Sequence, residues 1–241
     1  MAFYGERIRY GYCFGFKICR NKYLEKDCEG YYYMDIKSVR QGGELTFLHT
    51  LKNNKLNVAE ADLIEAKNKV VELIADFLSE YSRICSGAVV CRVPRSKTYF
   101  NESQLYFQQA IREAIASYFD CSKGFTSSRF IDGIDYIQRI KDVATTHLAK
   151  SQLAQATLRE LCSGDKPYPG ITKDSCFISD KVQDKTILLI DDIYTLGVNV
   201  VEDCIQALYD KGAGKVEFYA VGRTEKWGNT PQEEILLGCP F

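Results

Sequence analysis

The feature that most constrains the fold is one stretch near the C-terminus, TILLIDDIYTLGVNVVEDCIQALYDKGAGKVEF, which spans residues 186–218. It begins with an unbroken apolar run, the kind of strand that a parallel sheet buries on both faces. Two adjacent carboxylates, a glycine-containing turn and a segment with helical spacing of apolar residues follow it at once. A strand and a helix in this order predict an α/β fold with a mainly parallel sheet flanked by helices.

The alternation of strand-like and helix-like segments begins at residue 86 and supports the same class. Strands are expected at 87–93, 134–140, 176–179, 186–190 and 215–221, and helices at 101–119, 201–211 and within 142–161. On the helix over 101–119, the residues with core-facing spacing are Leu105, Ala110, Ile111, Ala114, Ile115 and Phe119. Residues 86–224 are therefore predicted to form the core of the fold.

The first 85 residues have a different texture, in which aromatic and polar residues alternate before a long helix. The alternation in YGYCFGFKICRNKYLEKD and YYYMDIKSV predicts a small antiparallel set of strands. Asn57, with Glu60 three residues later, has the pattern of a capping box at the start of the helix. The helical face that follows consists of Leu63, Ile64, Val70, Val71, Ile74, Phe77, Leu78 and Tyr81. We expect an N-terminal extension over 1–85, the core over 86–224 and a tail over 225–241.

Composition argues against several function classes, although a local basic patch is compatible with it. A net charge of −1 and a pI near 6.2 do not indicate nucleic-acid binding through a strongly basic surface. No apolar run is long enough to span a membrane, and the opening MAFYGERIRYGY lacks the apolar core of a signal peptide, so we expect a cytoplasmic protein. The ten cysteines include no CxxC pair, so we expect reduced, mostly buried thiols rather than a zinc ribbon.

Three explanations of ILLIDDIYTLG fit only in part. A receiver domain carries its acidic pair early in the fold, and only 49 residues follow Asp192 here. An ATPase would need a GxxxxGK[ST] loop upstream, and the nearest candidate, GAGK at 212–215, follows a helix and precedes a strand. Two solvated carboxylates at a strand end would explain the charges but not the turn after them.

A sugar-phosphate site accounts for the whole order of residues. Ligands bind at the carboxyl ends of parallel strands, where Asp191 and Asp192 can accept hydrogen bonds from the hydroxyls of a ribose. The turn then offers backbone N–H groups at a helix N-terminus, which suits a phosphate, and Thr195 and Asn199 add side-chain donors. The stretch thus predicts a site for a ribose 5-phosphate.

At these residues the chain resembles the type I phosphoribosyltransferases. Their signature is an apolar strand, two acidic residues, a hydrophobic and a variable residue, then Thr-Thr-Gly-x-Thr or Ser. The matching residues here are Asp191, Asp192, Ile193, Tyr194, Thr195, Leu196, Gly197, Val198 and Asn199, and the departures are Leu196 and Asn199. Over 86–224 the layout is most similar to the ComF or amidophosphoribosyltransferase-like branch, although the N-terminal segment lacks the cysteine pairs with which ComF-type proteins often bind zinc.

The resemblance implies a type I phosphoribosyltransferase fold and a phosphoribosyltransferase that binds 5-phosphoribosyl-1-pyrophosphate (PRPP) with Mg²⁺. It would transfer the 5-phosphoribosyl group to a base or amine and release pyrophosphate. Asp191 and Asp192 would be the catalytic pair, the turn from Thr195 to Asn199 would bind the 5-phosphate, and Mg²⁺ would be held mainly by PRPP oxygens. The pyrophosphate would meet Arg95, Ser96 and Lys97, and Arg95–Ser96 is the candidate for the non-trans peptide that often enters this loop in the family.

The family's mobile loop is expected at 139–152, with Arg139, Lys141, His147 and Lys150 as its candidate residues. The acceptor would be selected by extra residues, for which the N-terminal strands, the helix ending near 85 and the C-terminal tail are candidates. A non-catalytic sensor of PRPP or a nucleotide, or a subunit of a larger assembly, remains the alternative. Leu196 and Asn199 favour that alternative, and the intact acidic pair favours the enzyme. The acceptor, the pathway and a homo-oligomeric state are left open.

Overall fold

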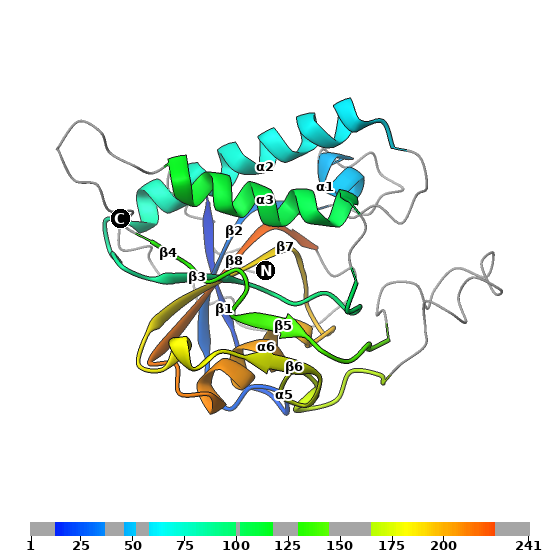
Figure 1. Ribbon diagram of the computed structural model, residues 1–241. Coiled ribbons are helices and arrows are strands. Elements are labelled where there is room, and N and C mark those ends of the chain that lie inside the picture. The colour runs from blue at the N-terminus through cyan, green and yellow to red at the C-terminus, as the bar shows by residue number, and fades with distance from the viewer. Residues whose placement is uncertain are drawn as a thin grey trace, which may run out of the picture.

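The computed structural model describes residues 13–36, 46–51, 58–99, 102–117, 130–144 and 165–224. A six-stranded sheet lies at its centre, with the strands in the spatial order β1 (Phe14–Ile18), β2 (Cys28–Ile36), β8 (Lys215–Thr224), β7 (Thr186–Thr195), β3 (Val89–Arg92) and β4 (Ile131–Asp132). Every neighbouring pair is parallel except β1 and β2. Helices cover both faces of the sheet (Figure 1). The expected α/β class with a mainly parallel sheet is confirmed.

The two N-terminal strands belong to the same sheet as the rest of the chain. β1 and β2 form the antiparallel pair that the alternation predicted, and β2 also runs parallel to β8, from the pair Gly30–Phe218 to the pair Ile36–Thr224. Gly30 permits a close approach at this junction, because a Cβ atom there would lie 2.6 Å from the ring of Phe16. The sheet therefore continues across residue 85, and β2 is as much a part of it as β8.

Three helices cover one face of the sheet: α1 (Thr46–Leu51), α2 (Glu60–Tyr81) and α3 (Glu102–Ser117). α2 begins after Ala59, which is extended and makes no side-chain capping hydrogen bond. The capping box expected from Asn57 and Glu60 is wrong, since Glu60 is the first helical residue rather than the third. Asn57 itself lies outside the described residues.

Most of the apolar residues that periodicity assigned to the inner faces of α2 and α3 are buried, but Ile64 and Leu105 are 41% and 39% exposed. Phe107, which was not assigned to the inner face, is only 5% exposed. Phe107 precedes Ala110 by three residues, so the two lie on the same face of the helix. Leu105 precedes Ala110 by five residues and points away from that face. Phe119 lies outside the described residues.

The opposite face of the sheet carries α6 (Val200–Asp210), the short α5 (Ile171–Ser175), the 3-10 turn η3 (Asp180–Val182) and a separate sheet of β5 (Ile137–Arg139) and β6 (Cys176–Ile178). The helix expected at 201–211 is confirmed as α6. The strands expected at 134–140 and 176–179 are real but pair with each other, antiparallel and outside the main sheet. The edge position belongs instead to β4, a two-residue strand too short to show any periodicity. The helix expected within 142–161 falls beyond residue 144, outside the described part.

Two observations bear on the expectations from composition. None of the described helices combines the length and the apolar character needed to cross a bilayer. The seven cysteines in the described ranges form no disulfide, and five of them are buried, as expected for small apolar core residues: Cys13, Cys28, Cys91, Cys176 and Cys204.

Candidate functional site

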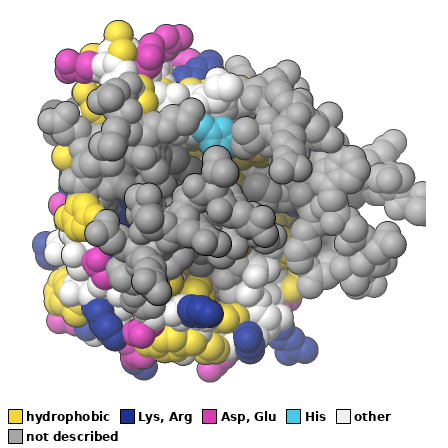
Figure 2. Space-filling view, turned by 90° about the vertical axis from the view of Figure 1, so that its right-hand side faces the viewer, with side chains coloured by type: hydrophobic (Ala, Val, Ile, Leu, Met, Phe, Trp, Pro, Cys, Tyr) yellow, Lys and Arg dark blue, Asp and Glu magenta, His cyan; other side chains and the backbone are white. Residues whose placement is uncertain are grey.

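The candidate site lies where the parallel strands end. Because β3, β7 and β8 run in the same direction, their carboxyl ends meet at one edge of the sheet, on the right of Figure 1. Figure 2 looks onto this side of the molecule, where lysine and arginine side chains lie among acidic and hydrophobic ones along the lower part, on the side of the sheet that carries α5 and α6. In open parallel sheets this edge is where ligands bind.

The acidic pair lies inside β7 rather than after it. The strand was expected to end at residue 190 but continues to Thr195, because β8 runs beside it as far as the pair Thr195–Thr224. Asp191 is half-buried, and Asp192 is buried at 7% exposure. Each carboxylate accepts a hydrogen bond from the backbone N–H of the next residue. Asp192 N–H donates to Asp191 Oδ1 at 2.8 Å, and Ile193 N–H donates to Asp192 Oδ1 at 2.6 Å. These contacts fix both carboxylates relative to the sheet edge.

The turn after β7 has a backbone that explains its unusual residues. Val198 N–H donates to the carbonyl of Thr195 at 3.2 Å, and Gly197 and Asn199 have φ values of 82° and 61°. Both lie in the left-handed region, which asparagine and glycine tolerate and β-branched residues such as threonine do not. Asn199 is therefore the residue type that this backbone accepts before α6. The side chain of Leu196 is 36% exposed.

Arg95 connects the loop after β3 to the acidic pair. β3 continues alongside β7 through a hydrogen bond from Val93 N–H to the carbonyl of Ile190 at 2.9 Å. The guanidinium of Arg95 then lies 3.8 Å from Asp192 Oδ2. The described residues contain no cis peptide bond, so the expectation of a non-trans Arg95–Ser96 bond is wrong.

The other two residues expected to bind pyrophosphate contact a neighbouring segment. Lys97 Nζ lies 3.4 Å from Asp142 Oδ2, and the carbonyl of Ser96 accepts a hydrogen bond from Val143 N–H at 2.8 Å. Asp142 also accepts a hydrogen bond from Thr98 N–H at 2.8 Å, which is the main reason that its pKa is lowered. Arg95 thus contacts Asp192 of the acidic pair, and Lys97 pairs with Asp142.

Arg139 lies in β5 and is buried, so its expected place in a mobile loop is wrong. Its Nε donates to the carbonyl of Arg95 at 2.8 Å and a terminal nitrogen donates to the carbonyl of Pro94 at 3.4 Å. A further donor reaches the hydroxyl of Ser175. Arg139 thus holds the backbone from which Arg95 projects. Lys141 is exposed and pairs with Asp165 at 2.6 Å, and His147 and Lys150 lie outside the described residues.

Arg92 is a charged residue near the site that was not among the residues expected from the sequence. Arg92, at the end of β3, is only 6% exposed, and burial together with the charge of Arg95 lowers its pKa to about 10. The negative charges that act on it in return are those of Asp135 and Asp191. Its signal was present in GAVVCRV, where it is the only charged residue of an apolar run. A buried guanidinium that still carries its charge at neutral pH adds positive potential between β3 and the acidic pair.

The oxygen atoms of Asp191 and Asp192 suit a metal ion that is bound mainly by the oxygens of a phosphorylated ligand. Within the described ranges, no three histidine, cysteine or acidic residues are grouped so that they could hold a metal ion. The carboxylates of Asp191 and Asp192 are hard oxygen donors of the type that Mg²⁺ accepts, and Mg²⁺ commonly binds through one or two carboxylates together with phosphate oxygens and water. The pair therefore fits a Mg²⁺ ion that arrives with a phosphorylated ligand.

Comparison with known proteins finds similarity at the level of solved structures only, and this similarity is distant. No protein-family model and no curated protein matches the chain. Among solved structures, the chain is similar to a purine phosphoribosyltransferase from Pyrococcus horikoshii Ot3, with 16% sequence identity and a TM-score of 0.33 over 76% of this chain and 95% of the other.

Proposed function

We propose that the protein is a Mg²⁺-dependent phosphoribosyltransferase of type I fold that binds PRPP at the carboxyl edge of the sheet. The observation that carries the proposal is the 3.8 Å contact between Arg95 and Asp192. It brings together the basic loop after β3 and the acidic pair of β7, which are far apart in the sequence. The turn from Thr195 to Asn199, called the phosphate-type turn below, begins three residues after Asp192, so donors for the 5-phosphate and for the pyrophosphate flank the acidic pair.

PRPP would lie across the three groups in order. Backbone N–H groups of the turn from Thr195 to Asn199, at the N-terminus of the 11-residue helix α6, would bind the 5-phosphate. The carboxylates of Asp191 and Asp192 would accept hydrogen bonds from the ribose hydroxyls. Arg95, supported by the charge of Arg92, would face the pyrophosphate.

Transfer breaks the bond between ribose C1 and the pyrophosphate oxygen, and pyrophosphate leaves with the electron pair. Arg95 stabilises the negative charge that develops on the leaving group, and the fixed carboxylates of Asp191 and Asp192 offset the positive charge that develops on the ribose ring. A nitrogen of the acceptor then bonds to C1 and gives up a proton. Mg²⁺, when bound, would neutralise part of the pyrophosphate charge.

The acceptor is proposed only as a base or amine. No described residue distinguishes between the two, and the segments suggested as selectors include the C-terminal tail, residues 225–241, which lies outside the described part.

The acidic pair provides the test. A double variant, Asp191→Asn with Asp192→Asn, should abolish pyrophosphate release from Mg²⁺–PRPP while the protein keeps its thermal unfolding temperature to within a few degrees. Asp180→Asn, a matched change at an exposed carboxylate that pairs with Lys211, should leave release unchanged. Full release by the double variant would remove the assignment of the pair, and PRPP binding without release by the wild type would favour the sensor.

A further inference from the structure

The loop between β1 and β2, residues 19–27, lies along α6 with its turn near the start of that helix. The turn is closed by two backbone hydrogen bonds between Asn21 and Leu24, at 2.8 and 3.2 Å. Further along, Glu25 N–H donates to Gln206 Oε1 at 3.0 Å, and Lys26 Nζ lies 3.6 Å from the centre of the Tyr209 ring. An N-terminal segment is thereby placed against the helix that begins at the phosphate-type turn.

A series of three hydrogen bonds, one of which crosses between the two segments, connects this loop to the phosphate-type turn. Tyr23 N–H donates to Asn21 Oδ1 at 2.7 Å, and Asn21 Nδ2 donates to Asn199 Oδ1 at 3.2 Å. Asn199 Nδ2 in turn donates to the carbonyl of Gly197 at 3.1 Å. The series therefore begins at a backbone N–H in one segment and ends at a backbone carbonyl in the other.

The two ends fix the orientation of both amide side chains. A backbone N–H can only donate, so Asn21 must turn its oxygen toward Tyr23 and its NH₂ group toward Asn199. A backbone carbonyl can only accept, so Asn199 must turn its NH₂ group toward Gly197. Reversing either amide would break two of the three hydrogen bonds and set like groups against each other.

We propose that Asn21 is a positioning residue for the phosphate-type turn, and that it holds Asn199 with its NH₂ group rather than its oxygen toward the turn. The inference rests on the proposed function, in which this turn binds the 5-phosphate of PRPP. An NH₂ group attracts a phosphate oxygen and an amide oxygen repels it. The hydroxyl that the family carries at this position rotates to donate without help, whereas an amide donates only if a neighbour orients it.

This role predicts an effect confined to the phosphate half of the ligand. Asn21→Ala removes the donor to Asn199, and Asn21→Asp keeps the acceptor for Tyr23 N–H but cannot donate once it is ionised. Gln206→Ala is the matched control, since it removes another contact of the same loop to α6 and leaves the three hydrogen bonds intact.

The experiment is calorimetric titration of the full chain and the three variants with ribose 5-phosphate and, separately, with pyrophosphate. Asn21→Ala should weaken ribose 5-phosphate binding by about fivefold, and Asn21→Asp by more, while pyrophosphate binding stays unchanged. The loss that Asn21→Asp shares with Asn21→Ala should persist in high salt, which screens the added charge but does not restore the missing donor. Wild-type affinity in Asn21→Ala, or an equal loss in Gln206→Ala, would overturn the role of Asn21.

A second measurement separates failure of this inference from failure of the proposed function. Wild-type protein that binds neither ribose 5-phosphate nor PRPP would contradict the proposed function. The side-chain NH₂ signals of Asn199 in the ¹⁵N NMR spectrum of the ligand-free protein would still decide whether Asn21 orients this amide. They should move in both Asn21 variants and stay in place in Gln206→Ala. Signals that stay in place in all three variants would overturn the proposal.

Discussion

The hydroxyl of Tyr194 donates a hydrogen bond to the carboxyl group of Glu202 at 2.9 Å, and both side chains are buried. The bond joins the end of β7 to the first turn of α6. Burial is the main reason that the pKa of Glu202 lies above its usual range. A carboxyl group whose pKa is raised on folding stabilises the fold at low pH, and that contribution is lost as the pH rises through the raised value.

Glu202→Gln should therefore flatten the pH dependence of stability. Compared with the wild type, the variant should gain stability at about pH 8, by roughly 1 kcal/mol, and little or nothing at about pH 4, where the wild-type carboxyl is already protonated. Thermal unfolding across this range measures the difference. Glu72→Gln, at a carboxylate that is 66% exposed, serves as the control and should show no such trend. A Glu202→Gln variant that is less stable than the wild type at about pH 8 would contradict the assignment.

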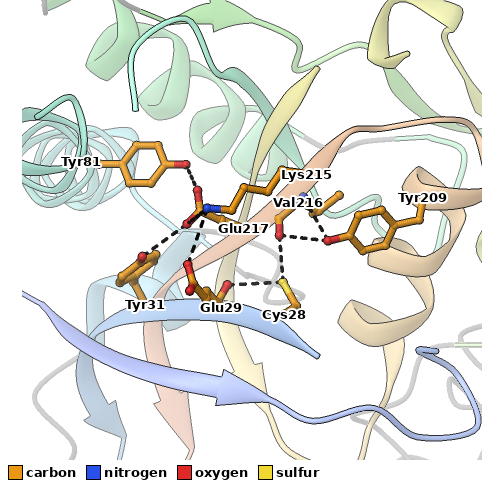
Figure 3. A network of polar contacts seen from close by, with 8 residues as sticks. All are labelled: Cys28, Glu29, Tyr31, Tyr81, Tyr209, Lys215, Val216 and Glu217. Carbon is orange, nitrogen blue, oxygen red and sulfur yellow. Dashed lines mark hydrogen bonds and ion pairs between the residues drawn. The ribbon is translucent and has the colours of Figure 1, made fainter. Parts of the chain in front are cut away.

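Tyr81 should contribute to stability through Glu217, at the amino end of β8. Figure 3 shows the network: the hydroxyls of Tyr81 and Tyr31 donate to Glu217, and Lys215 Nζ lies 3.1 Å from it. Glu217 is only 1% exposed, so removal of a donor leaves a buried carboxylate oxygen less well satisfied. Tyr81→Phe should lower the free energy of unfolding by about 1–3 kcal/mol in urea titrations. Tyr99→Phe, at a ring that is 68% exposed, is the control, and equal stability of the two variants would contradict the network's role.

The pKa of Glu29 is raised, chiefly by a hydrogen bond to Glu217 and secondly by burial. This bond requires a proton on one of the two carboxyl groups, so its contribution is present at low pH and is lost as the pH rises through the raised value. Glu29→Gln supplies a permanent donor and should reduce the loss of stability between about pH 5 and about pH 8. Unfolding curves that keep the wild-type pH dependence would show that Glu29 does not share a proton with Glu217.

Arg139 should affect the pyrophosphate half of the site without touching the ligand. Arg139→Lys keeps the charge but cannot span the carbonyls of Pro94 and Arg95 with a planar fork, so Arg95 loses its support. We expect about tenfold weaker binding of pyrophosphate and unchanged binding of ribose 5-phosphate. Arg83→Lys, at an exposed arginine that pairs with Glu80, should change neither. Equal weakening of both ligands by Arg139→Lys would point to a general loss of structure instead.

The order of elements around β7 and α6 could be predicted because it depends on short-range sequence patterns. The apolar run, the acidic pair, Gly197 and the helical spacing after it are each visible within a few residues. The true length of β7 was not visible, because its last five residues are held in the strand by pairing with β8. The parallel pairing of β2 with β8 joins residues 188 positions apart, such as Gly30 and Phe218, and such pairing leaves no local pattern.

The candidate site shows the same limit. Arg95 was found through its place after an apolar strand, but no local pattern distinguishes it from Lys97, which pairs with Asp142. Arg139 was assigned to the mobile loop through the family resemblance, and only the structure shows it buried beneath the loop after β3. Asn21 carries no motif at all. The division of the chain at residue 85 and the cytoplasmic location stay predictions.

The most direct test is calorimetric titration of the wild-type protein with PRPP, with and without Mg²⁺, followed by an assay of pyrophosphate release in the same sample. The account predicts Mg²⁺-dependent binding and slow release of pyrophosphate in the absence of an acceptor. Asp191→Asn with Asp192→Asn should then abolish the release. Absence of PRPP binding under both conditions would contradict the central claim that the carboxyl edge of this sheet is a PRPP site.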